Sequence, residues 1–326
     1  MNSAQSRFGL GLAALGRPGY INLGHAQDLR SNYAIGAMRK NAHAVLDAAW
    51  EGGIRYFDTA RSYGRAEEFL ASWIRDRGIK PNEIKVGSKW GYTYTAAWRV
   101  QTSNGIPHEI KRHTLEVLQA QFPQSMKNLA THLDLYQIHS AALESGVLEN
   151  QEVLNCLHEI SRSGIRIGLT VTGPNQAAVI EKALQIRFDN ELLFKSVQAT
   201  WNILETSATE ALQKAHDSGV QVIVKEGLAN GRLTSRNQQP EFAGKLAKLE
   251  GLALELGSTL DALALSAAIH QSWASIVLSG AACVTHLESN LKATETPWSD
   301  DLETALKSVC QAPEEYWSER AKLVWN

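Results

Sequence analysis

Short runs of β-prone residues alternate with helix-forming stretches along almost the whole chain. Between the runs, apolar residues recur at the helical spacing, as in residues 153–160 and 208–215, and both of these helices are followed by a Ser-Gly stop. Because this alternation is typical of βαβ units, it predicts a parallel sheet. The eight runs are residues 10–15, 55–57, 84–89, 133–139, 166–170, 197–200, 220–225 and 275–279.

Two architectures with a parallel sheet fit such a pattern. A doubly wound nucleotide-binding sheet needs a glycine-rich turn after its first strand and an acidic residue about 20 positions later. Gly9 and Gly11 lie inside or before the first run, and no third glycine completes that motif. Eight units in about 300 residues match a closed barrel instead. We therefore predict one α/β domain over residues 1–326, a (β/α)8 TIM barrel with long βα loops at its C-terminal face.

Composition excludes several classes of function. The 32 basic and 34 acidic residues give a net charge of −2, which lacks the basic surface of a nucleic-acid-binding protein. No apolar stretch reaches the about 20 residues that cross a bilayer. Residues 8–16 contain three glycines and precede a turn, so we do not interpret them as a signal peptide. Three widely separated cysteines fit a reducing compartment, and we expect a cytoplasmic protein.

Polar residues end three of the predicted strands. Asp58, Lys89 and His139 occupy these positions, and Tyr63 follows Asp58 by five residues. In a (β/α)8 barrel the C-terminal strand ends face one common site, so these four side chains are expected to meet there. Each also has a structural interpretation, such as a helix cap, a packing aromatic or a surface lysine. Together they form a stronger candidate site than any of them alone.

This set of groups suits acid catalysis. An ammonium near a phenol stabilises the phenolate, so Lys89 is expected to lower the pKa of Tyr63, while Asp58 holds Lys89 charged and in place. Tyr63 would then give a proton to a developing alkoxide, and His139 would orient the carbonyl oxygen or assist the transfer. The hydride for such a reduction must come from a cofactor.

Two long connections interrupt the alternation, at residues 17–39 and 90–107. The second contains Trp90, Tyr92, Tyr94 and Trp98. These aromatic residues either cover a hydrophobic patch or form a wall of a substrate pocket. For the second case we expect Trp90 and Trp98 to stack on a flat or partly apolar substrate. The aromatic residues near the C-terminus are expected to pack on the barrel or on a second subunit; they are Tyr316, Trp317 and Trp325.

At these motifs the sequence resembles the aldo-keto reductase family, and the similarity covers most of the chain. Residues 56–64, Tyr-Phe-Asp-Thr-Ala-Arg-Ser-Tyr-Gly, resemble the family's Asp and Tyr motif, and Lys89 and His139 lie where the family has its other two catalytic residues. The resemblance implies a (β/α)8 barrel and NAD(P)H-dependent reduction of a small-molecule aldehyde or ketone. It also implies that Tyr63 is the acid, that Lys89 and Asp58 tune it, and that His139 orients the substrate.

The resemblance extends to cofactor-binding positions. Residues 167–174 resemble the strand end that holds the nicotinamide carboxamide, where Thr170 keeps the family's hydroxyl and Val171 replaces its asparagine. Gln198 matches the family's glutamine at the same ring. Residues 225–233 resemble the segment that binds the pyrophosphate through backbone amides such as that of Leu228. Lys225 stands where many members stack an aromatic ring, and it is expected to pair with a phosphate or with Glu226.

Residues 279–290 resemble the family's adenosine-phosphate site, with Gly280, His286 and Asn290 as binding residues and Asn290 at the adenine. Members that prefer NADPH usually have Lys or Arg here, whereas this chain has Ala282 and His286. We favour NADP(H) over NAD(H).

Two other functions compete with this interpretation. A barrel of the same family can bind the cofactor and act as a regulatory protein without turnover. The tetrad of Asp58, Tyr63, Lys89 and His139 is compatible with both functions. A metal-dependent hydrolase would need a ligand pair such as His-x-His. His108, His113, His132, His139 and His158 show no such pairing, so we expect no metal. The oligomeric state is left open.

Overall fold

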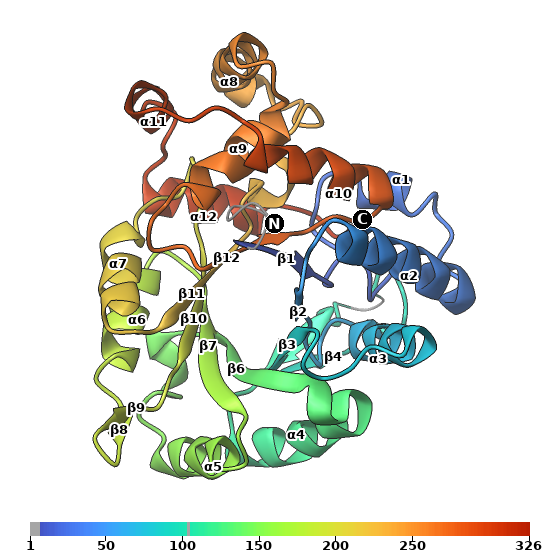
Figure 1. Cartoon of the computed structure of the whole chain (residues 1–326), viewed down its shortest axis with the longest axis vertical. Helices are drawn as coiled ribbons and strands as arrows, with labels where there is room; N and C mark the ends of the chain where they lie inside the picture. Colours follow the sequence, from blue (N-terminus) through green and yellow to red (C-terminus); the bar gives the residue numbers. More distant parts are fainter. Residues whose placement is uncertain (1–6, 103–104) are drawn as a thin grey trace.

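The computed structural model describes residues 7–102 and 105–326, and eight parallel strands form a closed barrel in it (Figure 1). Around the barrel the strands follow the order β1-β12-β11-β10-β7-β6-β3-β2, so the first strand pairs with the last. The predicted (β/α)8 barrel is confirmed. The barrel strands are β1 (Phe8–Gly11), β2 (Tyr56–Asp58), β3 (Lys85–Trp90), β6 (Leu133–Ala141), β7 (Arg166–Val171), β10 (Ser196–Thr200), β11 (Gln221–Lys225) and β12 (Ile276–Ser279).

Each predicted strand run overlaps one barrel strand, but the first one was misplaced. The run 10–15 was expected, whereas β1 ends at Gly11 because the chain then turns. The backbone amides of Leu15 and Gly16 donate to the carbonyl of Leu12 at 3.1 Å, which closes that turn. Two small antiparallel hairpins lie outside the barrel; they pair β4 (Tyr92–Tyr94) with β5 (Glu109–Lys111) and β8 (Arg187–Phe188) with β9 (Glu191–Leu192).

Most of the helices surround the barrel, whereas α8 lies farther out and packs on α9 (Figure 1). The helix α9 is apolar on nearly all sides and every residue in it except Asp261 is buried, which explains its long apolar run. The helices are α1 (His25–Asp28), α2 (Ile35–Glu51), α3 (Ala66–Arg77), α4 (Leu115–Leu129), α5 (Gln151–Ser161), α6 (Gln176–Ala183), α7 (Thr209–Asp217), α8 (Ala243–Glu255), α9 (Leu260–Ile269), α10 (Val284–Leu291), α11 (Asp300–Lys307) and α12 (Pro313–Ala321).

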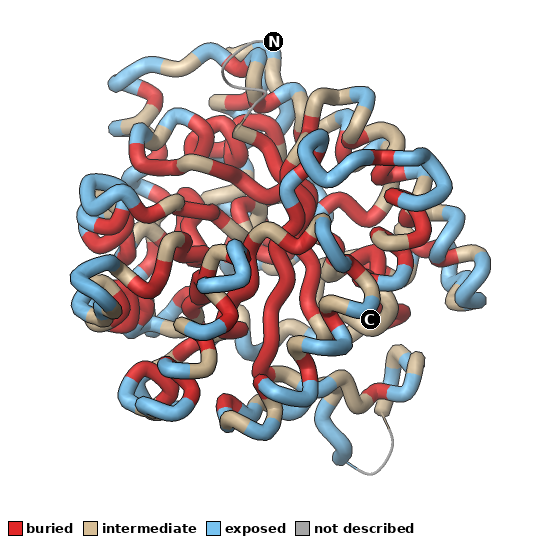
Figure 2. The backbone as a smooth tube through the Cα atoms, turned by 60° about the horizontal axis from the view of Figure 1, so that its bottom comes forward, coloured by how far each residue is buried: buried red, intermediate tan, exposed pale blue. Residues whose placement is uncertain are grey.

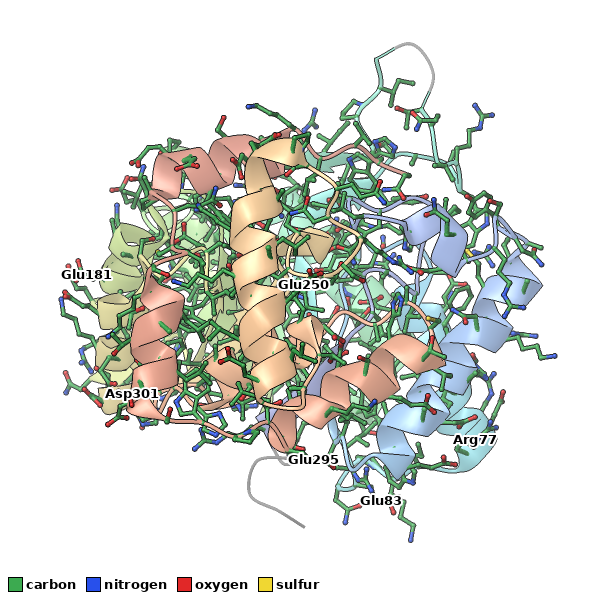
Figure 3. The ribbon with its side chains drawn as sticks, turned by 90° about the horizontal axis from the view of Figure 1, so that it is seen from above. Arg77, Glu83, Glu181, Glu250, Glu295 and Asp301 are labelled. Carbon is green, nitrogen blue, oxygen red and sulfur yellow. The ribbon has the colours of Figure 1, made fainter. Side chains whose placement is uncertain are left out.

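The strands are buried on both faces, and exposed residues lie on the surrounding helices and loops (Figure 2). Charged side chains such as those of Arg77, Glu181 and Asp301 lie on the outer surface (Figure 3). In the described part of the chain, no single helix is long and apolar enough to cross a membrane. One bent pair, residues 240–255 and 260–269, passes that test by length and composition, and its second helix is the buried α9.

The barrel interior has an apolar lower layer. Tyr56, Leu135, Ile223, Ile276 and Leu278 form a separate buried cluster there. Glycines make room for these side chains, since a Cβ at position 87 would lie 2.3 Å from the Tyr56 hydroxyl. Because side chains alternate between the two faces of a strand, the next inward residue on each strand lies one layer higher. That layer is the candidate active site.

Candidate active site

Polar residues replace apolar ones in the upper layer of the barrel interior. Asp58 follows Tyr56 on the same face of β2, and Gln137 and His139 follow Leu135 on β6. Lys225 likewise follows Ile223 on β11. The strand spacing alone therefore brings these side chains to one end of the barrel. The other inward residues of this layer are Lys89, Thr170 and Gln198.

Asp58 and Lys89 form a buried ion pair. The Lys89 ammonium donates to Asp58 Oδ2 and, at 2.8 Å, to the carbonyl oxygen of Thr59, and its side chain is 0% exposed. The second carboxylate oxygen of Asp58 accepts from Gln198 Nε2 at 2.9 Å and from Gln137 Nε2 at 3.4 Å. Burial lowers the pKa of Lys89, and the Asp58 carboxylate opposes that shift. The sequence had indicated neither amide contact.

Tyr63 lies in the loop between β2 and α3, above this pair. Its hydroxyl is 3.5 Å from His139 Nε2, and the two rings meet edge to face. Burial lowers the pKa of His139 well below its usual value, helped by the charges of Lys89 and Arg17, so the imidazole is neutral. The structure thus brings all four tetrad residues together.

The lowered pKa expected for Tyr63 is not found. Burial, together with the Asp58 carboxylate, raises the pKa of Tyr63 well above 10 and outweighs the lowering by the Arg17 charge. The Lys89 ammonium lies 4.9 Å from the centre of the Tyr63 ring. The phenol is therefore a protonated hydrogen-bond donor at neutral pH.

The end of β6 is held in an unusual backbone conformation. Ser140 has φ +55°, a left-handed value that costs free energy for a residue with a side chain. Its amide donates to Thr170 Oγ1 at 2.7 Å, and His113 Nε2 donates to the His139 carbonyl at 2.8 Å. These two contacts fix the position of His139. Thr170, predicted to bind cofactor, is fully buried behind Ser140 and does not line the cavity, whereas Thr172 does.

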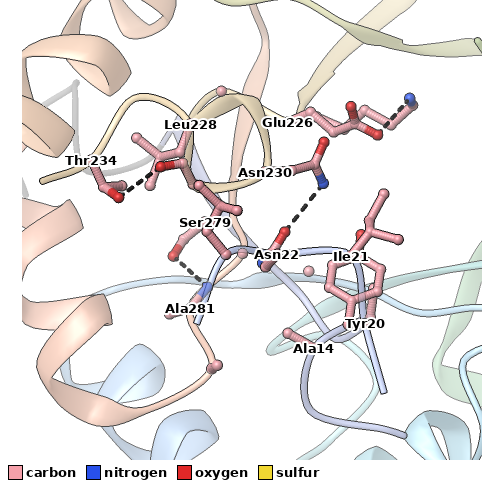
Figure 4. A pocket seen from close by; sticks show the side chains of 18 of the residues that line it. Ala14, Tyr20, Ile21, Asn22, Glu226, Leu228, Asn230, Thr234, Ser279 and Ala281 are labelled. Carbon is pink, nitrogen blue, oxygen red and sulfur yellow. Dashed lines mark hydrogen bonds and ion pairs between the residues drawn. The ribbon is translucent and has the colours of Figure 1, made fainter. Parts of the chain in front are cut away.

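A cavity of about 930 Å³ begins at the tetrad and continues across the C-terminal face of the barrel. Asp58, Tyr63, His139 and Gln198 line its inner end, and Asn290 lies at the other. Figure 4 shows residues from separate segments around it, with a hydrogen bond of 3.1 Å from Asn230 Nδ2 to Asn22 Oδ1. This volume lies at the upper end of the range of about 300 to 1,000 Å³ for small-molecule sites.

Aromatic residues surround the inner end of the cavity, and Tyr92 is the one among them that the sequence predicted there. Tyr20, Tyr92 and Trp325 line it. Trp90 is fully buried, because it follows inward-facing Lys89 and so points away from the barrel interior. Trp98 packs edge to face on Phe69 and donates to the Tyr33 carbonyl at 2.7 Å. Neither tryptophan lines the cavity, so the interpretation that they cover a hydrophobic patch describes their positions.

The C-terminal aromatic residues pack within the same chain. Tyr316 is fully buried and its hydroxyl accepts from Asn202 Nδ2 at 3.0 Å. Trp325 stacks on His108 with ring centres 4.1 Å apart, and the Arg17 guanidinium lies 4.7 Å from its ring. Arg17 also donates to Glu109 at 2.9 Å. This arrangement joins the loop after β1, the β4–β5 hairpin and the C-terminal segment into one wall.

Lys225 pairs with Glu226, one of the two partners expected for it. Lys225 Nζ donates to Thr200 Oγ1 at 2.6 Å and lies 3.6 Å from Glu226 Oε1. Arg320 on α12 binds both oxygens of the same carboxylate, at 2.5 and 2.7 Å. Burial opposes ionisation of Glu226, but Arg320 and Lys225 lower its pKa to about 2. Burial lowers the pKa of Lys225 to about 8. At neutral pH the cations of Lys225 and Arg320 share the single Glu226 carboxylate, so one positive charge is left over.

The outer end of the cavity contains the remaining predicted cofactor residues. Leu228, Gly280, His286 and Asn290 all line it, and the Asn290 amide is hydrogen-bonded to Ser279 Oγ at 2.8 Å. A Cβ at position 280 would meet no atom within 4 Å, so the backbone there faces open space.

Two charged residues at this end were not predicted from the sequence. Arg236 binds the Asp28 carboxylate at 2.5 and 2.9 Å, and His286 Nε2 lies 3.4 Å from the same carboxylate. Burial opposes ionisation of Cys283, but the hydrogen bonds from His286 and Thr285 lower its pKa to about 7. No sequence spacing connects residues 28, 236 and 283–286, and only the barrel brings them together.

Comparison with known proteins now identifies the class of molecule. A sequence model of a protein family, described as the Aldo/keto reductase family, matches residues 21–310. The chain therefore belongs to the aldo/keto reductase family. It is 24% identical over 342 residues to pyridoxal 4-dehydrogenase of Microbacterium luteolum, covering 90% of this chain and 96% of that one. Uncharacterized oxidoreductase YrpG of Bacillus subtilis is 22% identical over 308 residues, with 86% and 90% covered.

Among solved structures, the fold is similar to the aldo-keto reductase AKR11C1 from Bacillus halodurans in its holo form. The TM-score is 0.69 at 22% sequence identity, and the match covers 94% of this chain and 92% of that one. The family, with relatives named as oxidoreductases, supports an oxidoreductase, and aldo-keto reductases use nicotinamide cofactors.

The cavity residues fit a nicotinamide dinucleotide. Asn230 Oδ1 is buried at the cavity wall without a hydrogen-bond partner in the described residues, so it can accept from a ligand. The open backbone at Gly280 and the cations at Lys225 and Arg236 suit a long anionic molecule. Gln198 lies beside the tetrad, where it could hold the nicotinamide ring.

Proposed function

We propose that this protein reduces an aldehyde or ketone to an alcohol with NADPH or NADH, with Tyr63 as the general acid. The position of Tyr63 carries the proposal, because its hydroxyl lies 3.5 Å from neutral His139 at the inner end of a cavity that fits the cofactor. The bound cofactor supplies a hydride to the carbonyl carbon.

Tyr63 suits the role of proton donor in a reduction. Its raised pKa keeps the phenol protonated at neutral pH, so a proton is available when the carbonyl oxygen gains negative charge. Transfer of that proton leaves a phenolate above Lys89. The buried ammonium, 4.9 Å from the ring centre, stabilises this charge as it develops.

His139 positions the carbonyl oxygen. As a neutral imidazole it can donate one hydrogen bond without competing as an acid, and the contacts of Ser140 and His113 fix its place. Asp58 keeps Lys89 charged through a contact that two glutamines reinforce.

A bound cofactor would be held along the cavity. Gln198 and Lys225 would hold its nicotinamide end, the segments at Leu228 and Gly280 its phosphates, and Asn290 its adenine end. We favour NADP(H) over NAD(H), and the cationic Arg236 beside His286 supports this preference.

The substrate is a small carbonyl compound with a flat or partly apolar body. Tyr20, Tyr92 and Trp325 around the tetrad support this class, in place of the tryptophans first expected to form the wall. We propose that the protein acts in the cytoplasm on a small molecule, without a nucleic-acid or membrane partner.

A binding and turnover experiment tests this function. The protein is titrated with NADPH and NADH by tryptophan fluorescence, and 4-nitrobenzaldehyde or pyridoxal is then added while the nicotinamide absorbance is followed. Pyridoxal is included because one relative is named pyridoxal 4-dehydrogenase. We expect tighter binding of NADPH and consumption of the cofactor.

Two variants complete this test. Tyr63→Phe should lower turnover by about 10² to 10⁴-fold and leave cofactor affinity nearly unchanged. Tyr33→Phe, a tyrosine outside the cavity, should behave as the wild type. Equal turnover in Tyr63→Phe would remove the mechanism, whereas binding without turnover on a wide carbonyl panel would favour the regulatory protein.

A further inference from the structure

Three metal-binding side chains meet at the outer end of the cavity. Asp28 ends the short helix α1, while Cys283 precedes α10 and His286 lies in its first turn. One carboxylate oxygen, the thiol sulfur and one imidazole nitrogen all lie within 4.8 Å of one another. They come from segments about 250 residues apart in sequence, so the tertiary fold alone creates the group.

The distances suit a tetrahedral ion. With metal–ligand bonds of about 2.0 to 2.3 Å, nitrogen, oxygen and sulfur ligands of a zinc ion lie roughly 3.3 to 3.6 Å apart. His286 Nε2 and Asp28 Oδ1 are separated by 3.4 Å. Three protein ligands and one open position are also a common arrangement for this ion. Thiolate together with imidazole selects zinc-like ions over Mg²⁺ or Ca²⁺.

A cation already occupies part of this position. The Arg236 guanidinium donates to both oxygens of Asp28, and its Nη2 lies 3.3 Å from His286 Nε2. The Asp28 side chain is 6% exposed, whereas that of Arg236 is 36% exposed. The carboxylate is therefore enclosed and preformed, while the arginine can move into solvent.

We propose that Asp28, Cys283 and His286 form a binding site for a thiophilic divalent cation such as Zn²⁺, and that the bound ion displaces Arg236 and blocks the outer end of the cavity. Asp28, Arg236 and His286 all line that cavity. Occupation of the site would thus oppose binding of the cofactor, a consequence that rests on the proposed function.

Cobalt tests the site without any turnover. Co²⁺ is titrated into the reduced protein while the near-ultraviolet spectrum is followed, because a thiolate ligand gives an intense charge-transfer band and a tetrahedral site gives visible bands. Cys283→Ser should lose the charge-transfer band. Cys156→Ser and Cys310→Ser, which change the other two cysteines, should keep it.

A second variant gives the opposite change. Arg236→Met removes the competing guanidinium and should tighten Co²⁺ binding by about threefold or more, whereas a merely adventitious surface thiol would not respond. Thermal melting of each variant checks that the fold is intact. A band that survives in Cys283→Ser, or an Arg236→Met protein with unchanged affinity for Co²⁺, overturns the site.

Competition tests the second part of the proposal. Zn²⁺ should raise the apparent Kd of NADPH at least fivefold in the wild type and have little effect in Cys283→Ser. Cobalt binding that depends on Cys283, with NADPH affinity unchanged by Zn²⁺, overturns the blocking. If the metal-free wild type does not bind NADPH, the proposed function fails, and the cobalt titration still decides the metal site.

Discussion

Replacing Asp58 with Asn leaves the Lys89 ammonium buried without a counter-charge. The Lys89 side chain is 0% exposed, so water cannot take the place of the carboxylate. Removing one partner of such a buried pair costs about 3 to 5 kcal/mol. The protein can avoid part of this cost by binding one proton fewer, with Lys89 neutral in the folded state.

That alternative sets the pH dependence. Neutralising a lysine with an ordinary pKa near 10.4 costs about 5 kcal/mol at pH 7 and about 2 kcal/mol at pH 9. The folded variant has a lower lysine pKa than the unfolded chain, which therefore binds more protons, so stability rises with pH. We expect Asp58→Asn to lose about 3 to 5 kcal/mol at pH 7 and about 2 kcal/mol or less at pH 9.

Urea unfolding followed by tryptophan fluorescence at both pH values measures these losses. The double variant Asp58→Asn/Lys89→Met removes the buried charge, so it should recover most of the stability at pH 7 and lose the pH dependence. Glu181→Gln breaks a pair that is exposed on both sides and should cost less than about 1 kcal/mol. If Asp58→Asn were as stable as the wild type at pH 7, or if the double variant were no better than the single one, the reasoning about this pair would be refuted.

Three further changes test the site. Trp325→Ala should raise the KM of aromatic aldehydes by about tenfold, the equivalent of about 1.4 kcal/mol. Trp98→Ala should leave the KM unchanged, because Trp98 lies outside the cavity. Equal effects of the two variants would contradict the assigned wall. Gly16→Ala would place a Cβ 2.2 Å from the Tyr63 carbonyl oxygen and should lower turnover by at least about tenfold, while Gly244→Ala, with no atom within 4 Å, serves as the control. At pH values below its pKa of about 8, the Lys225 ammonium should repel the positively charged ring of NADP⁺. The affinity for NADP⁺ relative to NADPH should therefore rise by about tenfold from pH 6.5 to 9.5. Fluorescence titrations measure both affinities and should show no such rise in Lys225→Met.

Most of the fold follows from local patterns in the sequence. All eight barrel strands were predicted because parallel strands buried on both faces are short apolar runs, and helices of period 3.6 separate them. The first strand was misplaced because Leu12 to Leu15 is as apolar as a strand, while its backbone bonds close a turn. Apolar composition does not distinguish the two.

The tetrad was predictable because a strand end has a fixed direction in a barrel. The same rule, applied by residue parity, would have corrected one error: if Lys89 points inward, Trp90 must point outward. Parity does not reveal that Thr170 is covered by Ser140, since that depends on a left-handed residue at the end of β6.

The cavity walls were the least predictable part. Trp325 and Arg236 reach the cavity from loops whose course depends on tertiary contacts with Arg17 and Asp28. Their sequence neighbours carry no repeated pattern. The lowered pKa expected for Tyr63 was wrong for a related reason, because burial and the Asp58 carboxylate outweigh the nearby Arg17 cation, and burial is a property of the assembled loops.

The pairing of β1 with β12 imposes an order in time on the synthesis of this protein. About 265 residues separate the two strands, so at 5 to 20 residues per second β12 is made roughly 13 to 53 s after β1. The tetrad residues of β2, β3 and β6 are translated within that interval, whereas Gly280, His286 and Asn290 at the outer end of the cavity follow only after β12. Until its last strand emerges, the nascent chain therefore has one unpaired edge of β1 and an incomplete site. This delay makes the pairing of the closing strand, rather than the assembly of the catalytic half, the last step in forming the barrel.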